Sequence, residues 1–123
     1  MEVEASMIYP KTFIFDIDGT LVKHLGSLEA ITFEGPEILP GVRKKLDEIY
    51  HNGGYILLIT ARPPSMENLT RQQLEKLGII YNTLVMGVTH GCRYLVNDTK
   101  SDMNTTAVGI TVERNKGLEE LDI

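Results

Sequence analysis

Residues 12–20 have the sequence Thr-Phe-Ile-Phe-Asp-Ile-Asp-Gly-Thr. The first part of this stretch is a short run of aromatic and β-branched residues, which is typical of a strand buried on both faces. Two carboxylates, Asp16 and Asp18, follow directly and are ended by Gly19. In open α/β sheets the ligand lies beyond the carboxyl ends of the strands, so we expect both carboxylates where a substrate binds.

The rest of the chain alternates predicted helices with predicted strands. Helices are predicted from Gly41 to Gly53 and from Pro63 to Gly78, because each range carries apolar residues at helical spacing and ends at glycine. Further strands are predicted at Tyr55–Ile59, Ile79–Met86, Tyr94–Val96 and Ala107–Val112. The alternation favours a three-layer α/β fold with a central, mainly parallel sheet of five strands.

Glycine and proline interrupt every regular pattern between Gly19 and Pro40. We therefore predict a loop with a small hairpin over residues 19–40, which we call the flap.

The length, charge and cysteine content limit the class of protein. The 123 residues fit one domain, 1–123, and the net charge of -5 argues against nucleic acid as a partner. No apolar run approaches the length of a membrane span, and the acidic start Met1–Glu4 lacks the basic residues of a secretory signal. Cys92 is the single cysteine, which favours a reducing, cytoplasmic location.

The pair Asp16 and Asp18 suits phosphoryl chemistry. Two carboxylates this close repel each other, and Mg²⁺, which prefers hard oxygen ligands, relieves that repulsion. One carboxylate can attack phosphorus while the other donates a proton to the leaving oxygen. The alternative is an acidic turn, since Asp-Gly is a common turn former.

Residues 15–21, Phe-Asp-Ile-Asp-Gly-Thr-Leu, resemble the first signature motif of the haloacid dehalogenase (HAD) superfamily of phosphatases at every defining position. The resemblance implies that Asp16 becomes the phosphoaspartate and that Asp18 is the general acid and base. The second Asp argues against a haloalkanoate dehalogenase. The resemblance covers about residues 11–112 and also implies a Rossmann-like sheet with the first strand at its centre.

The second motif of that superfamily is a strand ending in Ser or Thr, and Leu57–Thr60 resembles it. The resemblance implies that Thr60 hydrogen-bonds the transferring phosphoryl group. Arg62, two residues later, is a candidate phosphate ligand because its forked guanidinium suits oxyanions. The alternatives are a helix cap for Thr60 and a surface charge for Arg62.

The fourth motif ends a strand in an acid, and Leu95–Asp98 resembles it, which implies Asp98 as a metal ligand with Asp16 and the carbonyl of Asp18. Asp102 is a candidate to support the metal or its bound waters without binding the metal directly. The third motif requires a Lys or Arg before the fourth strand. Arg93 is our first candidate for that phosphate-binding cation and Lys100 the second, while Lys76 is better explained by its helix end.

The intervals between the motifs leave no room for the folded cap that HAD enzymes usually insert, so the resemblance implies a capless form. Such an open site excludes water poorly unless a large substrate or a homo-oligomer covers it. Lys23, His24 and Phe33 of the flap are the local candidates for specificity, or else plain surface and packing residues.

Together these observations predict a Mg²⁺-dependent phosphatase that acts on a phosphorylated small molecule, with a sugar phosphate preferred. Two alternatives stay open. One is a phosphate-binding or regulatory protein that has kept the fold without catalysis, and the other is a phosphatase of nucleotides or polynucleotide ends.

Overall fold

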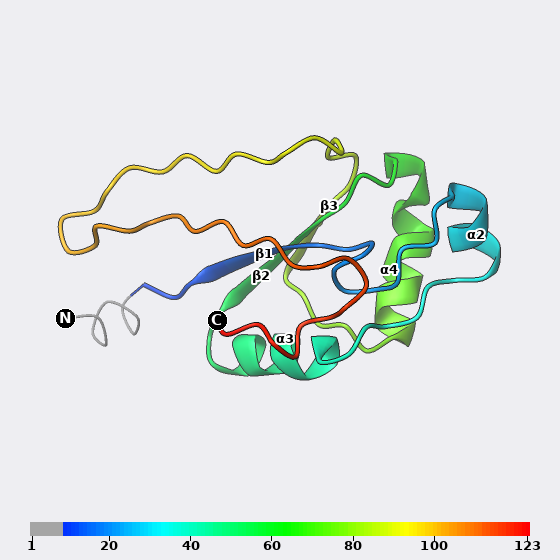
Figure 1. The fold of residues 1–123 in the computed structure, drawn as a ribbon, viewed down its shortest axis with the longest axis horizontal. Coiled ribbons are helices and arrows are strands. Elements are labelled where there is room, and N and C mark those ends of the chain that lie inside the picture. The colour runs from blue at the N-terminus through cyan, green and yellow to red at the C-terminus, as the bar shows by residue number, and fades with distance from the viewer. Residues whose placement is uncertain (1–8) are drawn as a thin grey trace.

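Three parallel strands form the sheet at the centre of the structure (Figure 1). The computed structural model describes residues 9–123, so the acidic N-terminus considered above lies outside the described residues. β1 (Thr12–Asp16) pairs with β2 (Tyr55–Ile59), and β2 pairs with β3 (Thr83–Val85). The register aligns Asp16 with Ile59 and Ile59 with Val85, so the carboxyl ends of the strands meet at one edge.

Helix α3 (Val42–His51) buries the residues that its spacing predicts. Val42 and Leu46 are fully buried and Ile49 is nearly so, and they join Ile56 and Leu58 of β2 in the hydrophobic core. The side chains at i, i+4 and i+7 share one face of a helix, which explains why this face packs on the sheet. The predicted helix over this range is confirmed.

Helix α4 (Glu67–Lys76) follows the 3-10 turn η1 (Pro64–Met66), so the second predicted helix is confirmed in two parts. Leu74 is buried on its inner face, and the same face also buries a polar residue, Thr70. In residues 9–123 no helix has the length and apolar character needed to cross a bilayer.

The prediction of a five-stranded sheet is wrong for the described chain, which has three strands. Residues 88–112, which we call the arm, contain both missing strands and run as a long excursion without a strand (Figure 1). Two hydrogen bonds join residues within the middle of the arm, from the Asn97 side chain to the Thr106 carbonyl and from the Thr106 hydroxyl to the Asp98 carbonyl. Within residues 9–123, β1 pairs with β2 alone, so it lies at an edge instead of the centre.

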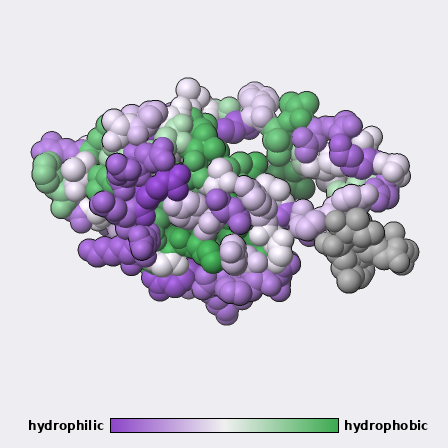
Figure 2. All heavy atoms as spheres, turned by 180° about the vertical axis from the view of Figure 1, so that it is seen from behind, coloured by the Kyte–Doolittle hydropathy of each residue, from purple (hydrophilic) through white to green (hydrophobic). Residues whose placement is uncertain are grey.

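The apolar residues of the arm explain why the sequence pattern misled. Tyr94, Val96 and Val108 are 88%, 87% and 71% exposed, and the view from behind shows apolar residues at the surface in this region (Figure 2). Aromatic and β-branched residues favour an extended backbone, but they do not specify a neighbouring strand. Pairing with a sheet is a tertiary contact that a short pattern cannot encode.

The flap contains a short helix, α2 (Leu28–Phe33), which the sequence pattern did not predict. Ser27 caps it, accepting a hydrogen bond from the Ala30 amide at 3.1 Å. On either side of α2 the predicted hairpin is reduced to a single antiparallel bridge between Val22 and Ile38.

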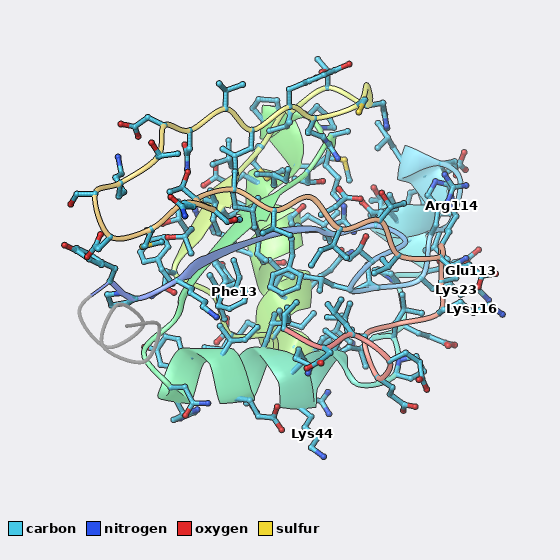
Figure 3. All side chains as sticks on the ribbon, turned by 60° about the vertical axis from the view of Figure 1, so that its left-hand side comes forward. Phe13, Lys23, Lys44, Glu113, Arg114 and Lys116 are labelled. Carbon is cyan, nitrogen blue, oxygen red and sulfur yellow. The ribbon has the colours of Figure 1, made fainter. Side chains whose placement is uncertain are left out.

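The C-terminal segment closes over the flap and the start of α3. The Leu118 amide donates to the Pro40 carbonyl at 2.9 Å, and the Leu118 side chain is 1% exposed. Asn115 bonds the flap twice, through its amide to the Gly19 carbonyl and through its side chain to the His24 amide, both at 2.8 Å. Figure 3 shows Lys23 of the flap at the same end of the molecule as Glu113 and Lys116.

This packing predicts that Leu118→Ala lowers the free energy of unfolding by about 2–5 kcal/mol, because it leaves a cavity in the core. Urea unfolding measures the difference. The matched control is Ile110→Ala in the arm, where 53% exposure limits the effect to about 0.5 kcal/mol. Equal effects at both positions would contradict the packing of this segment.

Candidate active site

Four polar residues lie at the carboxyl edge of the sheet because their strands end there. Asp16 is the last residue of β1, and Asp18 follows in a turn in which the Gly19 amide donates to the Val22 carbonyl and the Leu21 amide donates to the Ile17 carbonyl. Thr60 and Arg62 follow β2, the neighbouring strand. The predicted residues of the first and second motifs therefore meet on neighbouring strands.

Gly19 makes the turn after Asp18 feasible. Its φ of 90° lies in the left-handed region, and a Cβ there would lie 3.2 Å from Cγ of Arg114. The positive φ therefore favours glycine here, and a Cβ would in addition require the exposed Arg114 side chain to shift.

The carboxylate of Asp16 is partly accessible and has one cation beside it. Its side chain is 37% exposed, and Oδ1 lies 3.7 Å from a terminal nitrogen of Arg93. Burial raises the pKa of Asp16 above the usual 3.8, and nearby Asp18 adds to this, while Arg93, the Ile17 amide and His90 lower the pKa. The net direction is upward, so the site pays a cost in stability to keep Asp16 ionised at neutral pH.

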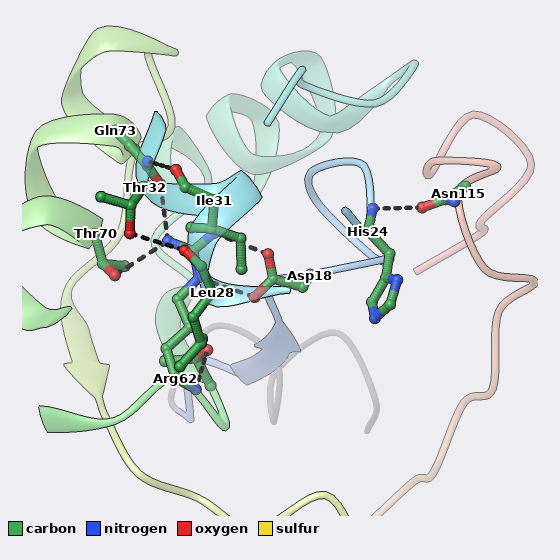
Figure 4. A network of polar contacts seen from close by, with 10 residues as sticks. Asp18, His24, Leu28, Ile31, Thr32, Arg62, Thr70, Gln73 and Asn115 are labelled. Carbon is green, nitrogen blue, oxygen red and sulfur yellow. Dashed lines mark hydrogen bonds and ion pairs between the residues drawn. The ribbon is translucent and has the colours of Figure 1, made fainter. Parts of the chain in front are cut away.

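Arg62 forms a buried ion pair with Asp18 (Figure 4). Nε donates to Oδ2 at 2.9 Å and Nη2 donates to Oδ1 at 2.8 Å, the forked geometry that arginine forms with carboxylates. The third guanidinium nitrogen, Nη1, donates to the Thr70 hydroxyl at 3.1 Å and to the Gln73 amide oxygen at 2.8 Å. The side chains of Arg62 and Asp18 are 2% and 18% exposed, so the pair is accessible from the side of Asp18.

This arrangement differs from the role predicted for Arg62. All three of its nitrogens are engaged by protein groups, and its side chain is buried. The structure therefore brings Arg62 to the predicted site with Asp18 as its ionic partner.

Thr60 is 1% exposed and is held by backbone bonds on both sides. Its amide donates to the Val85 carbonyl at 3.0 Å and its carbonyl accepts from the Val88 amide at 2.9 Å. The hydroxyl oxygen accepts from the Arg62 amide at 3.1 Å, which leaves the hydroxyl proton free for another acceptor.

The residues predicted in the arm are divided between two places. Arg93 lies beside Asp16 at the site. Asp98 and Lys100 pair with each other at 2.6 Å in an exposed position and are not brought together with Asp16 and Asp18. Asp102, the predicted supporting acid, is exposed in the same turn.

The Mg²⁺ site implied by the first motif does not assemble from these residues. Among residues 9–123 no three His, Cys, Asp or Glu side chains are grouped to hold a metal ion. Both oxygens of Asp18 face Arg62, and Asp98 has Lys100 as its partner.

Three residues of the site were missed by sequence patterns: Thr70, Gln73 and Asn115. Thr70 and Gln73 lie on α4 and accept hydrogen bonds from Arg62. A polar residue in a helical pattern usually indicates an exposed position, so the sequence did not indicate that these two side chains face the site. Asn115 has a φ of 63°, and asparagine is one of the few residues that tolerate this, so its identity was the one available signal.

Comparisons with known proteins give one structural likeness. No protein-family model matches the chain, and no curated protein matches it. A solved structure of D,D-heptose 1.7-bisphosphate phosphatase from B. bronchiseptica, complexed with magnesium and phosphate, is similar at 18% identity and a TM-score of 0.49. The likeness covers 67% of this chain and 54% of that chain, so this chain spans about half of that protein's length.

The raised pKa of Asp16 predicts a gain in stability for Asp16→Asn. In the native chain the free energy of unfolding falls as pH rises through the range above 3.8, because the folded state holds the proton more tightly than the unfolded state. The variant cannot ionise, so it should be more stable than the native chain at neutral pH. The difference should close as pH falls toward 3.8.

Urea unfolding in EDTA at several pH values measures this difference without bound metal. Exposed Asp102→Asn is the control and should show no such gain at neutral pH. A variant less stable than the native chain at neutral pH would contradict the assignment.

Proposed function

We propose that this chain is a phosphatase that hydrolyses a phosphomonoester through an aspartyl-phosphate on Asp16. The observation that carries the proposal is the presence of two differently placed carboxylates at the end of β1. Asp16 is accessible and lies beside Arg93, while Asp18 is held in one orientation by the buried guanidinium of Arg62. Nucleophilic catalysis needs such a carboxylate at the open edge of the site, and acid–base catalysis needs a second one in a defined orientation.

In the first step an oxygen of Asp16 attacks phosphorus and the bond from phosphorus to the ester oxygen breaks. In the free protein Asp18 is the ionised partner of Arg62, so it takes a proton from the substrate monoanion when the ester binds. The leaving oxygen then takes this proton from Asp18, so the alcohol departs neutral. In the second step a water molecule gives a proton to Asp18 and attacks phosphorus. The bond to Asp16 then breaks, and inorganic phosphate leaves with the proton of Asp18, which restores both carboxylates.

Two groups support binding of the phosphoryl oxygens. The Thr60 hydroxyl has a free proton at the strand end, and Arg93 supplies positive charge beside Asp16. Arg62 and Lys100 already have carboxylate partners, Asp18 and Asp98. In this proposal Arg62 therefore acts on Asp18, and phosphate binding depends on Thr60 and Arg93.

The substrate class we propose is a phosphorylated small molecule, with a sugar phosphate first. The net charge of -5 disfavours polynucleotide ends as substrates. The first motif resembles that of Mg²⁺-dependent phosphatases, although residues 9–123 assemble no group of metal-ligating side chains. A requirement for Mg²⁺ is therefore a separate arm of the test below.

A phosphate-binding protein without catalysis is the second candidate. The acids of residues 9–123 favour this second candidate, because no third carboxylate joins Asp16 and Asp18 as the resemblance implies for a metal site. The intact Asp16 and Asp18 oppose it, since binding an anion does not need two carboxylates.

The central test is phosphate release from sugar phosphates, nucleotides and phosphorylated oligonucleotides, each with Mg²⁺ and with EDTA. Asp16→Asn should reduce turnover to background because it removes the nucleophile. Asp18→Asn should reduce turnover by about 10²–10⁴-fold, the usual share of acid–base catalysis. Asp122→Asn, an exposed residue close to the end of the chain, is the matched control and should keep full turnover.

If the native chain binds phosphate but releases none from any ester, the binding protein is the correct interpretation. Turnover that survives EDTA would remove magnesium from the proposal and leave the two aspartates in their roles. Turnover that survives Asp16→Asn would contradict the nucleophile.

Thr60→Val should lower kcat by about 10²–10³-fold, the usual effect of removing one donor to a phosphoryl or carbonyl oxyanion. Thr60→Ser keeps the hydroxyl and should restore most of kcat, which separates the hydrogen bond from the packing of the methyl group. Equal losses in both variants, measured by steady-state kinetics, would show that Thr60 acts through packing.

A further inference from the structure

Gln73 links two parts of the candidate site that are far apart in the sequence (Figure 4). Its side-chain oxygen accepts a hydrogen bond from Nη1 of Arg62 at 2.8 Å. Its side-chain nitrogen donates to the carbonyl of Ile31, in helix α2 of the flap, at 2.9 Å. Since a guanidinium only donates and a carbonyl only accepts, these partners fix the orientation of the amide.

The carbonyl of Ile31 needs this partner. Ile31 lies in the last turn of α2, where the carbonyls of a helix lack partners within it. The amides of Glu34 and Gly35, which follow the helix, both bond the Ala30 carbonyl instead. Gln73 therefore completes the end of α2 and ties the flap to α4.

The other end of the link reaches the proposed general acid. Arg62 holds both oxygens of Asp18 and is itself 3% exposed, so it has little freedom to move without losing buried hydrogen bonds. A carboxylate has about four acceptor positions, so the side of Asp18 that is open to solvent stays available to a substrate. The orientation of Asp18 is thus set by Arg62, and that of Arg62 in part by Gln73.

We propose that Gln73 is a positioning residue that couples the flap helix α2 to Asp18 through Arg62. This inference rests on the proposed function, because it assigns Gln73 to the step in which Asp18 gives its proton to the leaving oxygen. Gln73 does not touch the substrate in this scheme. It keeps the proton donor aligned with the breaking bond from phosphorus to oxygen.

The test compares kcat/KM for two kinds of ester in Gln73→Met, which has a similar length and no hydrogen bonds to offer. An alkyl phosphate has a basic leaving oxygen and needs a proton from Asp18. A 2,4-dinitrophenyl phosphate has a stable leaving anion and needs none. The value of kcat/KM depends only on the steps up to release of the alcohol. The later attack of water on the aspartyl-phosphate therefore does not affect it.

We expect kcat/KM of the variant to fall by about 10-fold or more for the alkyl phosphate and by less than about 3-fold for the dinitrophenyl phosphate, within the range of acid catalysis. The ratio of the two values cancels any loss of folded protein. Gln72→Met, an exposed neighbour on α4, is the matched control and should leave the ratio unchanged. If Gln73→Met does not fold, the ratio is measured in Gln73→Asn, whose shorter side chain cannot keep the bonds to Arg62 and Ile31 together, and it should fall in the same direction.

Equal losses on the two esters would overturn the inference and make Gln73 a structural residue. An unchanged kcat/KM on both esters would overturn it as well. A native chain that hydrolyses neither ester would instead refute the proposed function, and the inference with it, so the two failures are distinguished by the native enzyme alone.

Discussion

A buried guanidinium must have hydrogen-bond partners for its nitrogens, because an uncompensated buried charge is strongly destabilising. Arg62 meets this requirement with groups from two other places in the chain: the carboxylate of Asp18 after β1, and Thr70 and Gln73 of α4. The loops after β1 and β2 are thereby joined to α4. In residues 9–123 no buried side-chain nitrogen or oxygen lacks a partner, which shows how fully this polar cluster is satisfied.

The same pairing determines how charge is distributed at the candidate site. Arg62 neutralises Asp18 from the buried side, while Asp16 keeps an accessible carboxylate with Arg93 as the nearby cation. Burial raises the pKa of Asp16, and Arg93 opposes that rise without cancelling it. An ionised carboxylate at the end of this edge strand therefore reduces stability, a trade that is common at functional sites.

Much of the sheet and of the site was predictable because the relevant signals are local. The spacing of Val42, Leu46 and Ile49 predicted α3, and the apolar run 55–59 predicted β2. Parallel strands place their carboxyl ends at one edge, and Asp16 at the end of β1 pairs with Ile59, the residue before Thr60. The arm was predicted wrongly because its β-branched residues specify an extended backbone without specifying a partner strand.

The sequence by itself determined the parts that follow from near neighbours along the chain: the helices α3 and α4, strands β1 and β2, and the carboxylates that emerge at the end of β1. Only the tertiary structure decided that Arg62 faces Asp18, that Leu118 enters the core and that Asp98 lies apart from Asp16. The reason is that periodicity records which residues share a face of one element. The partner of a buried charge or of an exposed strand is set by contacts between elements, and no local pattern records those.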